Sequence, residues 1–276
     1  MVPPAPWHDP GRPRASAATG LDPGSGRTLW RFEPPGATRL HAATFGGVLV
    51  VGTDTGLLYG LDAAGRLVWR LSAPGPVLRR PIAGAGLCLA LSSSASGGTA
   101  LLAVDAATGE RRWEAPLDAS GPATVRAWGR RIAVAGAVAG DPIVTALDRA
   151  GAPAWTVAPA LSGAVTAAAA GALLVVRDAA GALAALGRDG LARWSRPATP
   201  GAAPPRATAP LVVRGTVIAA GGDGAQVLDA RTGELVGALP APAPLRMAAD
   251  ARLAVATLDA DGLACGWRLA THLSVV

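Results

Sequence analysis

One short phrase recurs along the chain, and its spacing limits what the chain can fold into. Residues 104–113 read VDAATGERRW, and a glycine followed four residues later by tryptophan occurs at five evenly spaced places. These pairs are Gly26/Trp30, Gly65/Trp69, Gly109/Trp113, Gly151/Trp155 and Gly190/Trp194. A sixth copy, Gly233/Gly237, has lost the tryptophan, and successive copies lie 39 to 44 residues apart. A fixed period of this length indicates a repeat architecture.

Each repeat predicts four short strands. Two apolar runs separated by a glycine turn precede each phrase, as in GGVLVVGTDTGLLYGLD (46–62) and GALLVVRDAAGALAALG (171–187). An aspartate close to glycine between apolar runs is a hairpin signal, and no segment shows a sustained helical period. In the phrase itself, glycine supplies the positive φ of the turn, Asp105 and Thr108 bind backbone donors, and tryptophan covers a neighbouring sheet.

Sheets of this size bury their faces by stacking radially, so the prediction is an all-β, six-bladed β-propeller of four-stranded blades. Three strands in 244–269 and the outer strand 27–32 would complete the sixth blade, closing the ring by pairing of the N-terminal and C-terminal strands. The alternative is seven blades, with residues 7–22 in a further blade. The five complete units are expected at 37–76, 77–119, 120–160, 161–203 and 204–241.

Residues 1–15 are proline-rich, and we expect them to form a disordered tail before a propeller spanning 16–276. The uncharged stretch 150–176 is long enough for a membrane span, but Trp155 falls in register with the repeat, so it is interpreted as two strands and a loop. No membrane insertion is expected. Without an export signal the expected location is cytoplasmic, or periplasmic if the start is truncated.

The chain has a net charge of +6, and all of its positively charged side chains at neutral pH are arginines, because it has no lysine. These arginines are spread along the sequence rather than clustered, which argues against a nucleic acid partner. The two cysteines, Cys88 and Cys265, are far apart and form no CxxC pair, so they predict buried thiols rather than a disulfide framework or a metal site. The three histidines are scattered and no nucleophile elbow occurs, so no catalytic residue is assigned. The chain is expected to be a monomer.

Ala103, Asp105, Thr108, Gly109 and Trp113 together resemble the tryptophan-docking motif of the PQQ-like (quinoprotein-type) propeller family. The resemblance covers the chain from about residue 20 onward, whereas the Gly-His and Trp-Asp pairing of WD40 propellers does not occur. It implies a structural docking role for the repeat tryptophans, which are Trp30, Trp69, Trp113, Trp155 and Trp194.

The family contains enzymes and non-catalytic members. Its dehydrogenases hold a quinone and calcium with an asparagine ligand and an adjacent cysteine pair, and this chain has neither asparagine nor adjacent cysteines. The resemblance therefore implies a non-catalytic member, similar to the propeller lipoprotein of the outer-membrane β-barrel assembly machine, with a protein partner and no cofactor. The function expected is a scaffold for protein–protein interaction. A sensor domain for a small anionic ligand is the alternative, and a degenerate quinoprotein dehydrogenase is less favoured.

Arginine recurs where the innermost strand of a repeat begins. In a propeller these positions converge on one mouth of the channel, so they predict a rim that binds carboxylates, phosphates or an acidic partner loop. The rim candidates are Arg39, Arg79, Arg80, Arg126, Arg206 and Arg246. In the competing interpretation these arginines pair with the hairpin aspartates and add little stability. Those aspartates are Asp54, Asp141, Asp178, Asp223 and Asp261.

Overall fold

The structure is a computed structural model, and it describes residues 16–94, 97–117, 123–198, 208–221, 224–239, 246–249, 254–258 and 264–268. Every regular element among these residues is a β-strand. The predicted N-terminal tail, 1–15, lies outside the described residues. No helix in the described part of the chain is long and apolar enough to cross a membrane.

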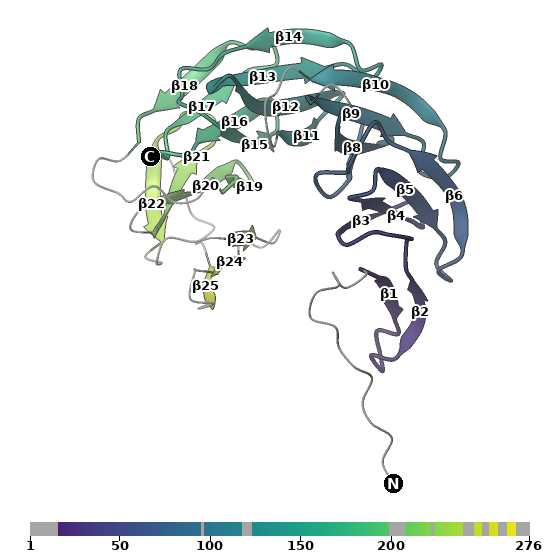
Figure 1. The fold of residues 1–276 in the computed structure, drawn as a ribbon. Coiled ribbons are helices and arrows are strands. Elements are labelled where there is room, and N and C mark those ends of the chain that lie inside the picture. Colours follow the sequence, from purple (N-terminus) through teal and green to yellow (C-terminus); the bar gives the residue numbers. More distant parts are fainter. Residues whose placement is uncertain are drawn as a thin grey trace. The chain divides into compact units, whose positions relative to one another are not determined.

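By its internal contacts the chain divides into two compact units, the first formed by Met1–Pro81 with Leu87–Glu114 and the second by Ile82–Gly86 with Ala115–Val276. Within the first unit, the first complete sheet has the strand order β3-β4-β5-β6, in which each strand pairs antiparallel with the next (Figure 1). Its strands are β3 (Leu40–Phe45), β4 (Val48–Thr53), β5 (Leu57–Leu61) and β6 (Leu67–Ser72). The next sheet has the order β7-β8-β9-β10, of which β8 and β9 lie wholly in the first unit and β7 belongs to the second. Its strands are β7 (Ile82–Gly84), β8 (Leu87–Ser93), β9 (Thr99–Val104) and β10 (Arg111–Leu117).

The second unit contains three further four-stranded sheets, each with its strands in chain order. The strands of the third sheet are β11 (Thr124–Trp128), β12 (Arg131–Val138), β13 (Asp141–Leu147) and β14 (Pro153–Val157). Those of the fourth are β15 (Val165–Ala170), β16 (Leu173–Asp178), β17 (Leu183–Leu186) and β18 (Ala192–Arg196). Those of the fifth are β19 (Leu211–Val213), β20 (Thr216–Gly221), β21 (Gly224–Asp229) and β22 (Leu235–Leu239).

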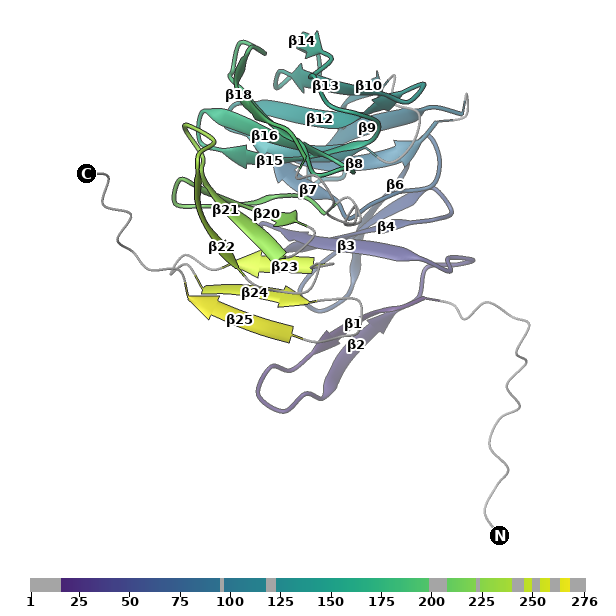
Figure 2. The same cartoon turned by 90° about the vertical axis from the view of Figure 1, so that its left-hand side faces the viewer.

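A sixth sheet in the second unit has three described strands, which lie side by side in Figure 2. They are β23 (Arg246–Ala249), β24 (Ala254–Leu258) and β25 (Ala264–Arg268). The repeated antiparallel sheets confirm the prediction of an all-β fold of the β-propeller class, and five complete sheets with a sixth agree with six blades. Closure of the ring by the terminal strands stays a prediction.

The N-terminal strand has a partner that the sequence analysis did not predict. The expected outer strand is β2 (Thr28–Phe32), and it pairs antiparallel with β1 (Ala18–Leu21) as a two-stranded sheet. β1 lies within residues 7–22, the segment that the seven-bladed alternative places in a further blade. The hairpin therefore brings a strand to the N-terminal part that the six-bladed scheme did not require.

The tryptophans of the phrase join one repeat to the next. The indole Nε1–H of Trp30 donates to the carbonyl of Ala63, and that of Trp69 donates to Ala106, in both cases in the turn of the following repeat. In the second unit Trp155 donates to Arg188 and Trp194 to Ala230 in the same way. These four bonds are 2.8 to 3.0 Å long.

Two structural requirements, one of the backbone and one of packing, place glycine in the turn. Gly109 has a φ of 75°, a region that other residues adopt with strain. A Cβ built on Gly109 would also lie 2.6 Å from the ring of Trp69, which packs against the turn. The aspartate of the turn binds the backbone as expected, because Asp105 Oδ1 accepts the N–H groups of Ala107 and Thr108.

A further tryptophan joins the third and fourth sheets, although it stands outside the repeated phrase. Trp128 is 1% exposed, and its Nε1–H donates to the carbonyl of Gly171 at 3.2 Å. Its ring meets that of Trp155 edge to face, with the centroids 6.1 Å apart. The guanidinium of Arg188 lies 5.2 Å from the same ring, a cation–π geometry. This junction therefore carries two indole hydrogen bonds rather than one.

Substituting the turn glycine tests the docking geometry. Gly109→Ala adds both the positive-φ strain and a clash with Trp69, whereas Gly26→Ala adds only the strain, because nothing lies within 4 Å of a Cβ at Gly26 (φ 69°). We expect Gly26→Ala to lower the free energy of unfolding by about 1–2 kcal/mol. Gly109→Ala is expected to cost about 1–3 kcal/mol more, owing to overpacking. Urea unfolding measures both, and equal losses would contradict the docking geometry.

The buried cysteine gives a second test. Cys88 is fully buried in the apolar core with Val50, Leu58 and Leu102, and burial raises the pKa of its thiol to about 12. Because the thiolate is the reactive form, Cys88 should resist alkylation at pH 8 in the native state and react on the order of a thousandfold faster in denaturant. The measurement is iodoacetamide labelling of a Cys265→Ala variant. Comparable native and denatured rates would contradict the burial of Cys88.

Candidate functional site

The first unit places three rim candidates at its surface. Arg39 directly precedes the innermost strand β3, while Arg79 and Arg80 lie between β6 and β7, and all three side chains are exposed. The segment that carries the latter pair is fixed to β8, because Val77 bridges to Ser92 and the N–H of Leu78 donates to Leu91. These arginines therefore project from an ordered backbone.

His41 shows that two of these arginines share one neighbourhood. Burial of the half-buried imidazole lowers its pKa first, and the positive charges of Arg39 and Arg79 lower it further, while Asp54 acts in the opposite direction. Arg39 and Arg79 both act on this imidazole, and Arg80 directly follows Arg79 in the chain. We call Arg39, Arg79 and Arg80 with His41 the first-unit arginine cluster. It is suited to anions, because guanidinium groups bind carboxylates and phosphates through charge-assisted hydrogen bonds.

The hairpin aspartates that are described serve the backbone. Asp54 accepts hydrogen bonds from the N–H and the hydroxyl of Thr38, and the hydroxyl of Thr38 holds the pKa of that carboxyl below its usual range. Asp178 accepts from the N–H groups of Ser162, Gly181 and Ala182. Asp141 begins β13 and is exposed, whereas Asp223 and Asp261 lie outside the described residues.

Several other arginines form ion pairs on outer strands and their turns. These pairs are Arg31–Glu33, Arg66–Asp62, Arg111–Glu114, Arg112–Asp105, Arg112–Glu110 and Arg193–Asp189. Asp54 and Asp178 therefore bind turn residues, and the pairing of the rim arginines with the hairpin aspartates stays a prediction.

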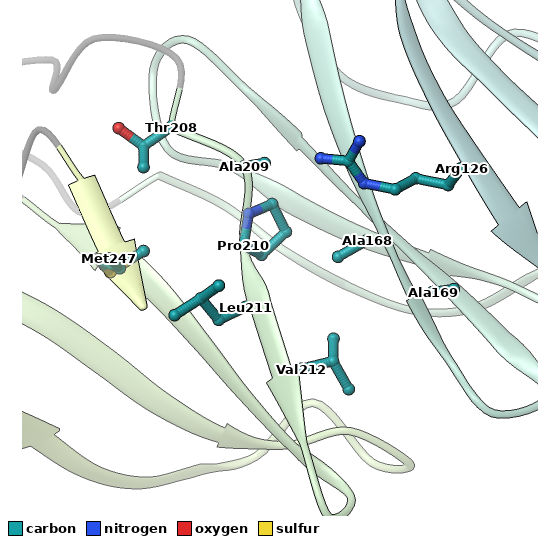
Figure 3. A pocket seen from close by; sticks show the side chains of 9 residues that line it. All are labelled: Arg126, Ala168, Ala169, Thr208, Ala209, Pro210, Leu211, Val212 and Met247. Atoms are coloured by element: carbon teal, nitrogen blue, oxygen red, sulfur yellow. The ribbon is translucent and has the colours of Figure 1, made fainter. Parts of the chain in front are cut away.

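In the second unit, Arg126 lines a cavity of about 660 Å³ (Figure 3). Arg126 is half-buried on β11, the innermost strand of the third sheet, and its Nη1 donates to the carbonyl of Val125 at 2.9 Å. The cavity walls come from β15, the segment leading into β19, β19 itself and β23. The remaining described lining residues are Ala168, Ala169, Thr208, Ala209, Pro210, Leu211, Val212 and Met247.

The other two rim candidates cannot be placed in the same detail. Arg206 lies outside the described residues. Arg246 begins β23 directly before the cavity residue Met247, and only its backbone is described. The structure thus brings Arg39 and Arg79 into one neighbourhood of the first unit and sets Arg126 on a cavity of the second.

The sequence analysis missed Arg177. This side chain is 0% exposed on β16, and its Nη2 donates to the carbonyl of Ala220 at 2.8 Å while Nη1 donates to that of Thr208 at 3.4 Å. Burial lowers its pKa, and the neighbouring Asp178 opposes that shift. The available signal was a charged residue inside the otherwise apolar run LLVVRD, where a buried cation needs partners across the sheet boundary.

No group of three or more histidine, cysteine, aspartate or glutamate side chains among the described residues is placed to hold a metal ion. Of the three histidines, His8 and His272 lie outside that part of the chain.

Solved structures resemble this chain in fold. BamB from Moraxella catarrhalis matches over 92% of this chain and 91% of its own, with 16% identity and a TM-score of 0.50. The computationally designed protein Ika8 matches over 88% and 75%, with 15% identity and a TM-score of 0.69. Quinohemoprotein alcohol dehydrogenase from Comamonas testosteroni matches over 92% and 62%, with 14% identity and a TM-score of 0.66. At these identities the likeness concerns the fold alone.

Comparison of sequences identifies the family more specifically than comparison of folds does. Outer membrane protein assembly factor BamB from Nitrosomonas eutropha is 32% identical over 108 residues, which is 39% of this chain and a quarter (25%) of the length of that relative. The model of the family described as outer membrane protein assembly factor BamB matches residues 14–141 and 140–266, and together these cover most of the chain. The repeated phrase, the sheets and this match agree: the chain belongs to the PQQ-like β-propeller family described as outer membrane protein assembly factor BamB.

Proposed function

We propose that this chain is a non-catalytic β-propeller that binds a protein partner, with acidic side chains of that partner meeting the first-unit arginine cluster. The family match supports the proposal, because the family is described as an outer membrane protein assembly factor. The observation that carries it is the exposed set Arg39, Arg79 and Arg80, held on ordered backbone beside His41.

The physical case depends on how the arginines are presented. An exposed guanidinium offers five donors in a planar fork, which matches carboxylate geometry. Because Asp54 binds Thr38, its carboxylate is already engaged by the turn. Clustered cations also speed the encounter with an acidic surface through long-range attraction, which salt screens.

Removing the guanidinium groups of the first-unit arginine cluster should weaken binding of the protein partner. We expect affinity capture from an extract of the source organism to enrich one protein reproducibly, and Arg39→Ala/Arg79→Ala/Arg80→Ala to lower its recovery at least tenfold. Each lost charge-assisted bond removes a favourable contact, and raising the salt should mimic the loss. Quantitative mass spectrometry measures the recovery.

The matched control removes three other exposed arginines of the same unit, Arg31, Arg66 and Arg111, whose guanidinium groups pair with nearby carboxylates. This control changes the net charge equally and should retain the partner. If both triple variants lose it alike, general charge rather than the cluster binds it. If the wild-type chain enriches no protein, the scaffold proposal is wrong.

A ligand test separates this proposal from a degenerate quinoprotein dehydrogenase. A molecule that binds only the folded state raises the melting temperature, by an amount that grows with its concentration above Kd. We expect pyrroloquinoline quinone with calcium to leave the melting temperature unchanged in a thermal-shift assay. A saturable increase would favour the quinoprotein reading.

A further inference from the structure

The cavity of the second unit has the size of a small-molecule site. Its volume of about 660 Å³ lies within the range of roughly 300–1,000 Å³ that ligand pockets occupy. The residues that enclose it come from the innermost strands of several sheets, β11, β15, β19 and β23. Side chains held on strands keep their positions more precisely than side chains on loops.

One side of the cavity is aliphatic. Figure 3 shows Leu211 directed toward Met247, and both pack against the buried cluster that contains Ile218. Val212 points to the other side of β19 and packs against the cluster that contains Val175. The apolar wall is therefore continuous with the core on both sides, and none of the described lining residues is aromatic.

The other side carries a cation. Figure 3 shows the Arg126 side chain reaching from β11 toward the segment that holds Ala209 and Pro210. A guanidinium presents five N–H donors in a planar fork that matches a carboxylate, and Nη1 of Arg126 donates to the carbonyl of Val125. None of the described lining residues is acidic, and the Thr208 side chain adds a hydroxyl.

A second cation lies behind the wall. Arg177 binds the carbonyl of Thr208, a cavity residue, and its Nε has no hydrogen-bond partner among the described residues. A buried charge is screened less than one at the surface. The counter-charge of Asp178 is directed to the N–H groups of Ser162, Gly181 and Ala182. Arg177 therefore places a second guanidinium against the wall that contains Thr208.

We infer that this cavity binds a small organic carboxylate with a short aliphatic body, its carboxylate on Arg126 and its chain against Leu211 and Met247. The inference goes beyond the proposed protein scaffold and does not depend on it. A cation with the same alkyl body would meet Arg126 with like charge, and a carboxylate without a body would leave the aliphatic wall uncovered.

Methionine supplies a local readout, because the chain has only two methionines, Met1 and Met247. With ¹³C-methyl methionine labelling, octanoate should shift the Met247 signal saturably and leave the Met1 signal unchanged, and Met247→Leu assigns the two signals. Octylammonium and acetate serve as probes that lack the anion or the alkyl body. Each should bind at least tenfold more weakly than octanoate.

Three variants locate the site. Arg126→Gln should weaken octanoate tenfold to a hundredfold, the range of a lost hydrogen bond between charged groups, and Arg126→Lys should weaken it less. Ala168→Leu should narrow the cavity at β15 and weaken octanoate binding. Arg193→Gln is the matched control, because Arg193 pairs with Asp189 in a surface turn of the same unit. Circular dichroism and urea unfolding establish that each variant is folded.

The inference is overturned if Arg126→Gln binds octanoate as tightly as the wild-type chain, if octylammonium shifts Met247 equally, or if Met1 shifts in parallel. Unweakened binding of octanoate by folded Ala168→Leu would have the same meaning. The triple variant of the first-unit arginine cluster should keep its octanoate affinity, so failure of this inference and failure of the scaffold proposal give different results.

Discussion

Neighbouring sheets in this molecule are joined by hydrogen bonds in which one sheet supplies the donor and the next sheet supplies the acceptor. The indole N–H of an outer-strand tryptophan finds its acceptor in the turn of the following repeat, as Trp69 does at Ala106. A buried N–H without an acceptor costs free energy, so the tryptophan and the turn must keep a constant spacing along the chain. The turn glycine must remain small because the ring lies against it. The regular spacing of the phrase along the sequence therefore follows from this one contact between neighbouring sheets.

That dependence explains how much of the fold could be predicted. The phrase around Asp105 specifies a local turn, and the apolar runs before it specify strands buried on both faces, so the five complete sheets fall within the predicted units. Trp128 was not predicted to join sheets because it stands outside the phrase, and only the structure shows its bond to Gly171. β1 was missed because four residues, ATGL, give too short a pattern to predict a strand.

The candidate site was less predictable, because position along a strand does not determine which surroundings a long side chain meets. Arg39 and Arg126 both stand near the start of an innermost strand, but Arg39 directly precedes β3 and is exposed, whereas Arg126 lies within β11, is half-buried and lines a cavity. Charge alone would pair the hairpin aspartates with these arginines. In the turns, however, backbone N–H groups lie close to the carboxylates and donate hydrogen bonds to them. Arg177 stood in a run that looked like core, and its role depends on carbonyls from other strands.

The sixth copy of the phrase lacks the indole, and this has a consequence for motion. Gly237 stands at the tryptophan position of β22, where an added Cβ would meet only Val227, at 3.9 Å. Among the described residues, Leu211, Leu239 and Met247 pack together where the fifth sheet meets the sixth. A boundary held by packing alone opens locally at a lower free energy than one that must also break a buried hydrogen bond. Leu211 and Met247 also line the cavity, so local opening at this boundary, which lacks the indole hydrogen bond, would let a bound molecule exchange with solvent.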